Sequence, residues 1–522
     1  MTSSERGSAH LTRRAFLLGA AATTAAAALP AWSLASASRA SVPARRMREL
    51  ASATRGPLVT RLDAGLFVAA QVWNARFDGR RPAGVLYALD ARDVQAAVRW
   101  AARYGVPITA RAGGHCYQGY STINDGLVVD LTNLSEVVPR YGRVPYARVG
   151  GGASLGVAYR ALSAVGRTIP GGTCPTVSVG GLAQGGGMGM VARRWGPLSD
   201  NVLGFRIVTP DGRIRDVGPG RDRDLFWACR GGGGGNFGII TSYDIRTHPT
   251  DPAMRFVFRF AWSECADVVL AWQDWAHQTG DGLFTMCGLV TNPGDAEPII
   301  QVSGQYFGDE AGLAAEVAPL LARVTPTSRD VTAASYASLI QHWAECTHAA
   351  ADQCARQAAN PGPGGVASRP MWWGKSDYVG ESSPMPRAGA EAMRDHVASL
   401  HARGFATGEV LLDSYGGAIN RVSPTATAFA HRDMRYSIQY VAYWSDTDWQ
   451  GPSVRWLRSL ERALRPHVTG QKYINYIDSD QRNRPEAYYG RNLDRLIDTR
   501  RRFDPDDVFR FRQAIPLRRG AA

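Results

Sequence analysis

The stretch that decides the fold reads RAGGHCYQGYS over residues 111–121. It follows an apolar segment, residues 105–110, that is typical of a strand, and a glycine pair stands directly before His115. Glycine adopts positive φ readily and lets the backbone approach a ligand closely, so the amides of such a loop can bind a pyrophosphate. Similar loops occur at residues 171–174 (GGTC) and 231–238 (GGGGGNFG). Tight turns alone would also explain the glycines, but the residues that end the three loops favour a nucleotide site.

The segments around these loops predict two kinds of architecture. Between Gly84 and Arg246, short strands alternate with helices, such as a helix over residues 91–104 whose apolar residues recur with the helical period. From about Pro252, polar and apolar residues alternate as in an antiparallel sheet, and helices fall between the strands. The strands expected there are residues 255–260, 285–291, 299–306, 408–414 and 436–443; the helices are residues 265–278, 311–322, 388–402 and 452–464, and a last helix is expected over 488–502.

The loops resemble those of the berberine-bridge-enzyme-like FAD-linked oxidases, members of the vanillyl-alcohol-oxidase superfamily. The Rossmann fingerprint, GxGxxG between a strand and a helix, and the P-loop GxxxxGK[ST] are not found, which disfavours the usual nicotinamide- and ATP-dependent enzymes. The resemblance runs from about residue 70 to 516 and rests on residues 111–121, 171–177 (GGTCPTV), Asn475-Tyr476-x-Asp478 and 503–510 (FDPDDVFR).

This resemblance implies an α+β fold. A two-part FAD-binding domain of the vanillyl-alcohol-oxidase type is expected beside a substrate domain with an antiparallel sheet backed by helices. The expected boundaries are 38–250 for the N-terminal part of the FAD-binding domain, 251–465 for the substrate domain, and 466–522 for a C-terminal segment that returns to the FAD-binding domain.

The resemblance also implies FAD held by two covalent bonds, from His115 to the flavin 8α-methyl group and from Cys174 to C6. Imidazole and thiolate are the side chains best able to add to an electron-poor isoalloxazine near neutral pH. A histidine bonded to the backbone and a buried, inert thiol are the alternatives. No metal site is expected. The other flavin-binding positions implied are Arg111, Gly113, Gly114, Gly119, Tyr120, Gly171, Gly172, Thr173, Gly180, Gly185, Gly238, Ile240, Tyr473 and Asn475.

For the reaction, the resemblance implies Tyr476 as the base that takes a hydroxyl proton while hydride passes to flavin N5. Residues 473–476 are expected to form a strand, with Tyr473 and Asn475 facing the flavin and Tyr476 facing the substrate. An ordinary tyrosine has a pKa of about 10, so its phenolate must be stabilised; a core tyrosine is the alternative. Asp413 and Gln439 match the family's substrate cleft. Asp413 is expected to share the proton transfer or, alternatively, to cap a turn.

Several further residues refine this hypothesis. Met188 stands where many relatives carry a tyrosine, and a thioether cannot donate a hydrogen bond, which favours Tyr476 as the single base. Val177 is small enough to leave room for dioxygen over the flavin, which favours an oxidase. Lys375 and Asp377 are each expected to serve in a salt bridge or in another structural role at a strand end. The candidates to stack on a sugar ring are Trp343, Trp372 and Trp373.

The N-terminus is typical of a twin-arginine export signal over residues 1–37. Arg13-Arg14 precede an apolar, alanine-rich run, and Ala35-Ser36-Ala37 offers a cleavage site. A membrane anchor is the alternative, but the run is shorter than the roughly 20 residues needed to span a bilayer. The twin-arginine machinery is therefore an expected partner, no stable membrane insertion is expected, and the mature protein is expected outside the cytoplasm. Disulfides are permitted there, and Cys346–Cys354 is the expected pair.

The net charge is +13, from 59 Lys+Arg and 46 Asp+Glu. Such an excess raises nucleic acid as a partner, but no helix-turn-helix, RRM or zinc-finger pattern accompanies the arginines, so no nucleic-acid partner is expected. The predicted function is a secreted FAD-dependent oxidase of a sugar, oligosaccharide or other alcohol, with dioxygen as acceptor and hydrogen peroxide as product. The alternatives are a tailoring oxidase of secondary metabolism and, less favoured, a non-catalytic flavin- or glycan-binding protein.

Overall fold

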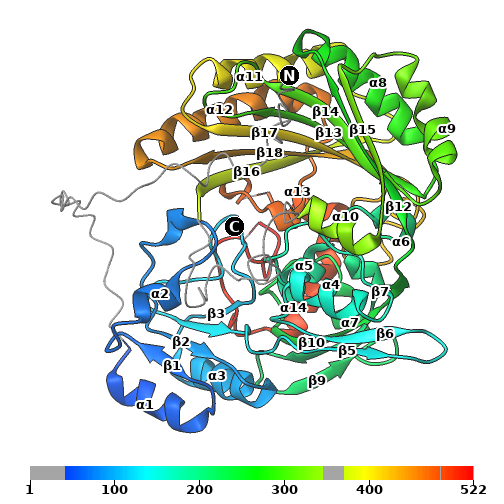
Figure 1. The fold of residues 1–522 in the computed structure, drawn as a ribbon. Helices are drawn as coiled ribbons and strands as arrows, with labels where there is room; N and C mark the ends of the chain where they lie inside the picture. Colours follow the sequence, from blue (N-terminus) through cyan, green and yellow to red (C-terminus); the bar gives the residue numbers. More distant parts are fainter. Residues whose placement is uncertain (1–41, 345–368, 483, 521–522) are drawn as a thin grey trace, which may run out of the picture.

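The computed structural model describes residues 42–344, 369–482 and 484–520, whose main sheets have four, five and seven strands (Figure 1). In the four-stranded sheet, α3 (Ala91–Tyr104) covers one face. The carboxylate of Asp90 caps the start of this helix, and Gly105 ends it with φ of 63°. These caps explain why the helix keeps the bounds that its sequence predicts. The sheet has the order β1 (Leu58–Thr60), β2 (Gly84–Tyr87), β4 (Leu127–Asp130), β3 (Ile108–Arg111), and α1 (Ala44–Ala53) and α2 (Leu66–Ala70) lie beside it.

The five-stranded sheet is antiparallel, and the C-terminal part of the chain packs in its core. Helix α14 (Leu493–Phe503) buries Leu493, Leu496 and Ile497 in the same core as Phe205 and Tyr243 of this sheet. The C-terminal segment therefore packs on the glycine-loop side of the molecule. The strand order is β5 (Val137–Arg140), β6 (Tyr146–Gly150), β10 (Ile239–Arg246), β8 (Val202–Val208), β9 (Ile214–Val217), with α4 (Leu155–Ser163), α5 (Val179–Gly185) and α7 (Arg223–Ala228) packed near it.

The seven-stranded sheet is antiparallel throughout, and a layer of helices covers one of its faces (Figure 1). Trp272 of α8 (Cys265–Gln278) and Leu457 of α12 (Gln450–Leu464) are fully buried in that core. The other face of the sheet remains available to line a cavity. The strand order is β15 (Ser328–Ala334), β12 (Ala253–Phe260), β14 (Ile299–Tyr306), β13 (Leu283–Thr291), β17 (Thr407–Ser414), β18 (Met434–Trp444), β16 (Met371–Gly380); the remaining helices include α9 (Glu310–Leu321), α10 (Tyr336–Trp343) and α11 (Arg387–His401).

This architecture confirms the α+β fold class, and two local predictions are wrong. Residues 473–476 were expected to form a strand, but Ile474–Tyr476 is a 3₁₀ turn in which the Tyr476 amide donates to the Tyr473 carbonyl (2.9 Å). The helix expected over 488–502 is interrupted at Gly490, whose φ of 48° favours glycine, so α13 (Glu486–Tyr489) ends before it.

The exact domain boundaries stay predictions, and the Cys346–Cys354 pair lies outside the described residues. Within the described part of the chain, no helix has the length and apolar character needed to cross a membrane.

The sequence contains two lysines, and both are buried in one network of carboxylates. Lys375 Nζ on β16 donates to Glu461 Oε2 (2.8 Å), Asp478 Oδ2 (2.6 Å) and Asp480 Oδ2 (2.9 Å). Lys472 Nζ donates to the other Glu461 oxygen (2.9 Å). The ammonium of Lys375 thus gives one hydrogen bond to each of three carboxylates, which are close enough together to share a cation.

This network, which also includes the ion pair of Lys472 with Asp377 (2.8 Å), confirms the structural salt bridges expected of Lys375 and Asp377. Burial alone would lower the pKa of Lys375, but the carboxylates of Asp478 and Glu461 outweigh burial and raise it. The ammonium is therefore charged at all physiological pH values. It ties β16 and α12 to the segment that follows Tyr476.

Replacing Lys375 by methionine should lower the free energy of unfolding by about 3–5 kcal/mol, because it leaves buried carboxylates without their cation. Urea denaturation followed by tryptophan fluorescence measures the change. Arg148→Met, which breaks the exposed Arg148–Asp244 pair, is the matched control and should cost less than about 1 kcal/mol. Equal, small losses in both variants would contradict the proposed importance of the network.

Candidate active site

A continuous cavity of about 2130 Å³ lies between the glycine loops and the open face of the seven-stranded sheet. Residues 112–118 and 172–178 line one side, and residues of β13, β17 and β18 line the other. Typical small-molecule sites have volumes of roughly 300–1,000 Å³. The cavity therefore has room for a dinucleotide together with a second molecule.

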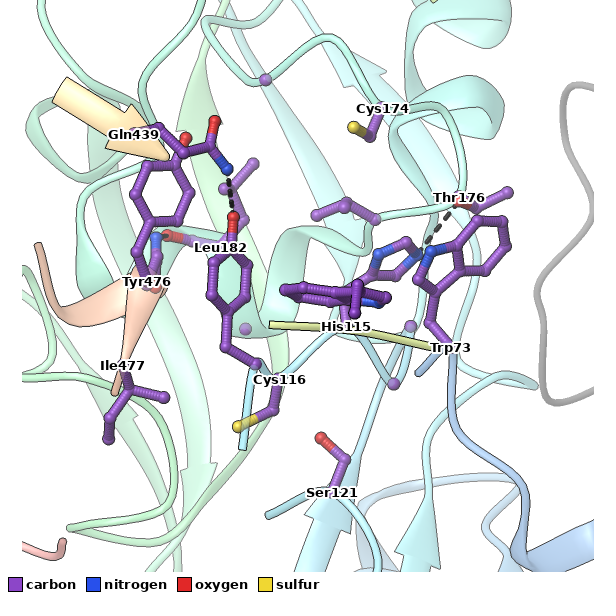
Figure 2. Close-up of a pocket in the computed structure, with 18 of the residues that line it drawn as sticks. Trp73, His115, Cys116, Ser121, Cys174, Thr176, Leu182, Gln439, Tyr476 and Ile477 are labelled. Carbon is purple, nitrogen blue, oxygen red and sulfur yellow. Dashed lines mark hydrogen bonds between the residues drawn. The ribbon is translucent and has the colours of Figure 1, made fainter. Parts of the chain in front are cut away.

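His115 lies on the wall of this cavity (Figure 2). Its ring stacks on the indole of Trp73, with centroids 4.7 Å apart and 18° between the planes. His115 Nε2 lies 3.0 Å from Thr176 Oγ1. The neighbouring Gly114 has φ of 70° and accepts a hydrogen bond from the Trp73 amide (3.1 Å), so the loop that carries the histidine is fixed. These contacts hold the imidazole in one orientation at the cavity.

Cys174 lies on the second glycine loop, and its thiol lines the same cavity (Figure 2). Helix α4 supports this loop from behind. The Leu155 amide donates to the Val177 carbonyl (2.8 Å), and the Tyr159 hydroxyl donates to the Gly172 carbonyl (2.9 Å). The loop therefore presents the thiol from a rigid base.

Most of the residues predicted to bind flavin line the cavity, but Arg111 does not reach it. Arg111 is fully buried, with Nε donating to Asp130 Oδ2 (2.5 Å) and a terminal nitrogen donating to the Gln71 carbonyl (3.1 Å). Its guanidinium joins β3, which leads into the first glycine loop, to β4. The predicted residues that line the cavity are His115, Cys174, Gly113, Gly114, Tyr120, Gly172, Thr173, Gly180, Gly238, Ile240, Tyr473 and Asn475.

The predicted glycines at 119, 171 and 185 also lie away from the cavity, and they make room for neighbouring side chains. A Cβ added to Gly185 would come within 2.1 Å of Asn475 Oδ1, and one added to Gly171 would come within 2.6 Å of the Tyr159 hydroxyl. At Gly119 the Cβ would meet the ring of Phe77 at 2.5 Å. The absence of a side chain at these glycines therefore leaves room for neighbouring side chains.

The turn after Lys472 brings Tyr473 and Asn475 together. The Tyr473 hydroxyl accepts from Asn475 Nδ2 (2.9 Å) and from the Gly187 amide (2.7 Å). Asn475 Nδ2 also donates to the Leu182 carbonyl of α5 (3.0 Å). The two side chains face the same side, as the sequence predicted, although a turn and not a strand achieves it.

Tyr476 belongs to an aromatic cluster that lines the cavity (Figure 2). Its ring stacks on Tyr117, with centroids 5.0 Å apart, and meets Tyr473 edge-on at 4.9 Å. Gln439 Nε2 on β18 donates to the Tyr117 hydroxyl. The structure therefore brings together Gln439 and Tyr476, which are distant in sequence.

Tyr117 is a cavity residue that the sequence-based set lacks. The available signal was its position in the same loop as His115, two residues after it. Its ring also packs edge-on against Trp372, with centroids 4.3 Å apart. The tyrosine thus links the histidine loop to β16.

Asp413 extends from β17 at the same part of the cavity, between Met286 of β13 and Ser437 of β18 in the strand register. Burial raises the pKa of this carboxyl group from its ordinary value to about 6. An aspartate with this pKa is ionised at neutral pH and can still accept a proton readily.

Tyr476 differs from Asp413 in its protonation state at neutral pH. Its pKa is raised well above the ordinary value, chiefly by burial and further by Tyr117 and by the negative charge of Asp413. In the described structure the phenol therefore keeps its proton at neutral pH. Between these two candidates, the electrostatics favour Asp413 as the proton acceptor.

The remaining candidates divide into two groups. Trp373 does not line the cavity: its Nε1 donates to Asp478 Oδ1 (3.1 Å), so its indole belongs to the lysine network. A sugar-stacking role is therefore not available to Trp373. The candidates that do line the cavity are Met188, Val177, Trp343 and Trp372.

Two family models and a relative in Arabidopsis thaliana show the family to which the chain belongs. A model described as FAD binding domain matches residues 82–218, and one described as Berberine and berberine like matches residues 472–516. Berberine bridge enzyme-like 12 of Arabidopsis thaliana is 30% identical over 486 residues, covering 86% of this chain and 87% of its own. The chain belongs to the berberine bridge enzyme-like family.

Two further relatives agree with this membership. An FAD-linked oxidoreductase of Bacillus subtilis (strain 168) is 30% identical over 89% of this chain and 98% of its own. The structure of BBE-like 1 from Physcomitrella patens superposes with a TM-score of 0.81 at 29% identity, covering 91% of this chain and 99% of that one. This berberine bridge enzyme-like protein is therefore an FAD-linked oxidoreductase, and FAD is its cofactor.

Proposed function

We propose that this protein is an exported oxidase that converts a CH–OH group of a sugar or oligosaccharide into C=O, using covalently held FAD and dioxygen. The observation that carries the proposal is the environment of Asp413. It provides a carboxylate with a pKa of about 6 in the cavity that Tyr476, His115 and Cys174 also line.

The residues present fit FAD held at two points. His115 and Cys174 offer an imidazole and a thiol to one cavity, and both are nucleophiles suited to a flavin ring. Gly181 lines the same cavity, and a Cβ added there would meet no protein atom within 4 Å, so this wall is open to a ligand. When bound, FAD would accept hydride from the carbinol carbon and pass the electrons to dioxygen, which yields hydrogen peroxide.

We assign the proton transfer mainly to Asp413. The substrate hydroxyl must lose its proton as the carbon loses hydride, and the ionised carboxylate is the stronger acceptor in this part of the cavity. Tyr476 and Tyr117 carry hydroxyl groups that orient the substrate oxygen, and Gln439 fixes Tyr117 through its hydrogen bond. In this assignment Asp413 takes the larger share of the work, and Tyr476 positions the substrate.

The open face of the seven-stranded sheet favours a carbohydrate over the ring system of a secondary metabolite. It presents the polar side chains of Gln301, Ser303 and Glu409 together with the ring of Tyr443. Sugars require hydrogen-bond partners and aromatic faces at the same time, and an apolar ring system requires mainly apolar walls. The mixed lining therefore supports the sugar hypothesis.

The reaction class can be tested with a panel of sugars and simple alcohols. Under anaerobic mixing, a true substrate should bleach the flavin absorbance at about one equivalent, and in air it should release hydrogen peroxide. If no sugar bleaches the flavin but another alcohol does, the tailoring reaction is favoured. No bleaching with any compound would favour a non-catalytic binding protein.

Asp413→Asn should lower kcat roughly 10²–10⁴-fold, because a positioned base contributes about that factor. In the wild type, activity should rise as the pH increases through about 6, since the carboxyl must lose its own proton to act as a base. Steady-state peroxide release from pH 4 to 9 measures both effects. Asp395→Asn on the surface of α11 is the control. An unchanged acidic limb in Asp413→Asn would overturn the assignment.

Denatured enzyme should remain yellow, because the flavin is expected to be bonded to the chain. Acid precipitation followed by absorbance of the pellet measures retained flavin. Cys174→Ala and His115→Ala should each retain flavin through the remaining bond, and the double variant should release it. Free FAD in the supernatant of the wild type would contradict covalent attachment.

Export through the twin-arginine machinery is part of the proposal and is supported by residues 1–37. This route carries folded proteins, which suits an enzyme that acquires FAD before leaving the cytoplasm. Replacing both Arg13 and Arg14 by lysine should retain active enzyme in the cytoplasm, as measured by cell fractionation. Unchanged export of that variant would overturn this part of the proposal.

A further inference from the structure

Methionine side chains contribute to the wall of the cavity. Every methionine of the sequence except Met1 belongs to the described residues, and three of them, Met188, Met190 and Met286, line the cavity. Met190 is 7% exposed, whereas Met188 and Met286 are partly exposed. Met371 is the one other described methionine that is partly exposed, and it does not line the cavity. Met188 and Met286 are therefore the methionines that a small molecule in the cavity can reach.

Met286 lies beside Asp413 on the open face of the seven-stranded sheet. The two residues are paired across β13 and β17. Side chains of directly paired residues in antiparallel strands point to the same face, and their Cβ atoms are roughly 4.5–5.5 Å apart. Phe284 and Gly288, two residues before and two after Met286, also line the cavity. The thioether is therefore a direct neighbour of the candidate base, in the part of the cavity where the proposed oxidation takes place.

Met188 lies next to the second glycine loop, since a Cβ added to Gly172 would lie 3.5 Å from the Met188 carbonyl oxygen. The preceding amide, that of Gly187, donates to the Tyr473 hydroxyl (2.7 Å). Both Met188 and Met286 pack against the buried cluster to which Tyr473 belongs. The two methionines are therefore in one part of the cavity, close to the candidate attachment loop and to the candidate base.

The proposed reaction releases hydrogen peroxide into this part of the cavity, and peroxide oxidises thioethers to sulfoxides. The sulfur lone pair attacks one peroxide oxygen, and an S–O bond forms as the O–O bond breaks. The proton of the attacked oxygen passes to the other oxygen, which leaves as water. Sulfur loses two electrons and the peroxide gains them, so the step needs no further oxidant.

Thiols are the other side chains that peroxide oxidises, and their thiolate is the form that reacts. Cys116 also lines the cavity, but burial raises the pKa of its thiol, so the thiolate is scarce at neutral pH. The proposed bond to the flavin engages the sulfur of Cys174. A thioether reacts without losing a proton, so the cavity methionines are the side chains best suited to take up this oxidant.

We propose that Met188 and Met286 are the sites at which the enzyme's own peroxide modifies the chain, and that sulfoxide at Met286 ends turnover. A sulfoxide is polar, whereas a thioether accepts hydrogen bonds only weakly. Beside Asp413, the sulfoxide oxygen competes with the carboxylate for the substrate hydroxyl, and proton transfer to Asp413 is lost. The inference rests on the proposed function, which supplies the peroxide, and goes beyond it by assigning a modification that limits the number of turnovers.

Mapping of sulfoxides after turnover tests the two sites. The holoenzyme is supplied in air with the sugar or alcohol that releases peroxide fastest, and catalase in the solution destroys the peroxide that has left the cavity. Peptide mass spectrometry should find about tenfold more sulfoxide at Met188 and Met286 than at Met371, which is partly exposed outside the cavity. The same mixture without dioxygen should show no increase at any of the three.

Two variants test the effect on turnover. Met286→Leu keeps the volume of the side chain and removes the sulfur. The fraction of activity lost per turnover, measured against the initial rate of the same variant, should be about tenfold smaller than in the wild type. Met371→Leu is the matched control and should lose activity as the wild type does. If Met286→Leu fails to fold, the sulfoxide map of the wild type still decides the inference.

The two hypotheses fail in different ways. If peroxide is released but sulfoxide at Met188 or Met286 stays at the level of Met371, the modification sites are refuted and the oxidase remains. The same holds if Met286→Leu folds and loses activity as fast as the wild type. If no compound leads to peroxide release, the proposed function is refuted and this inference with it.

Discussion

A buried ammonium surrounded by carboxylates holds together the parts of this protein that form its active site. Lys375 is on β16, Glu461 is on α12, and Asp478 follows Tyr476 by two residues. Charges taken out of water are tolerated only when they are paired and hydrogen-bonded, so this contact admits one arrangement of the three segments. Because the C-terminal segment is fixed in this way, the aromatic cluster around Tyr476 has a defined place opposite the histidine loop.

The site itself is assembled from distant segments, and each contributes a different property. The glycine loops of the N-terminal part present His115 and Cys174 from rigid backbones. The large sheet contributes Asp413, whose pKa depends on burial and not on a local partner. The C-terminal turn contributes Tyr476. The two candidate attachment residues and the candidate base therefore come from different sides of one cavity.

The sequence predicted the elements whose signals are local. The bounds of α3 and α8 follow from helical periodicity, and His115 and Cys174 follow from the glycine motifs. β16 was missed because it is buried along most of its length and shows no alternation. Tertiary contacts decided the rest. Arg111 pairs with Asp130, and Trp373 serves the lysine network, and neither partner could be read from the neighbouring residues. The pKa of Asp413 likewise could not be predicted from the sequence, because it depends on the burial of the carboxyl group in the folded protein.

Arginine, and not lysine, supplies the basic side chains at the surface of the folded protein. The side chains of Lys375 and Lys472 are 1% and 6% exposed, and the sequence contains no other lysine. Reducing sugars condense with the ε-amino group of lysine to form Schiff bases, whereas the guanidinium group of arginine keeps its proton. The folded chain is therefore protected from glycation at lysine. Acylation of its two ε-amino groups by an amine-reactive reagent would report opening of the buried network of lysines and carboxylates.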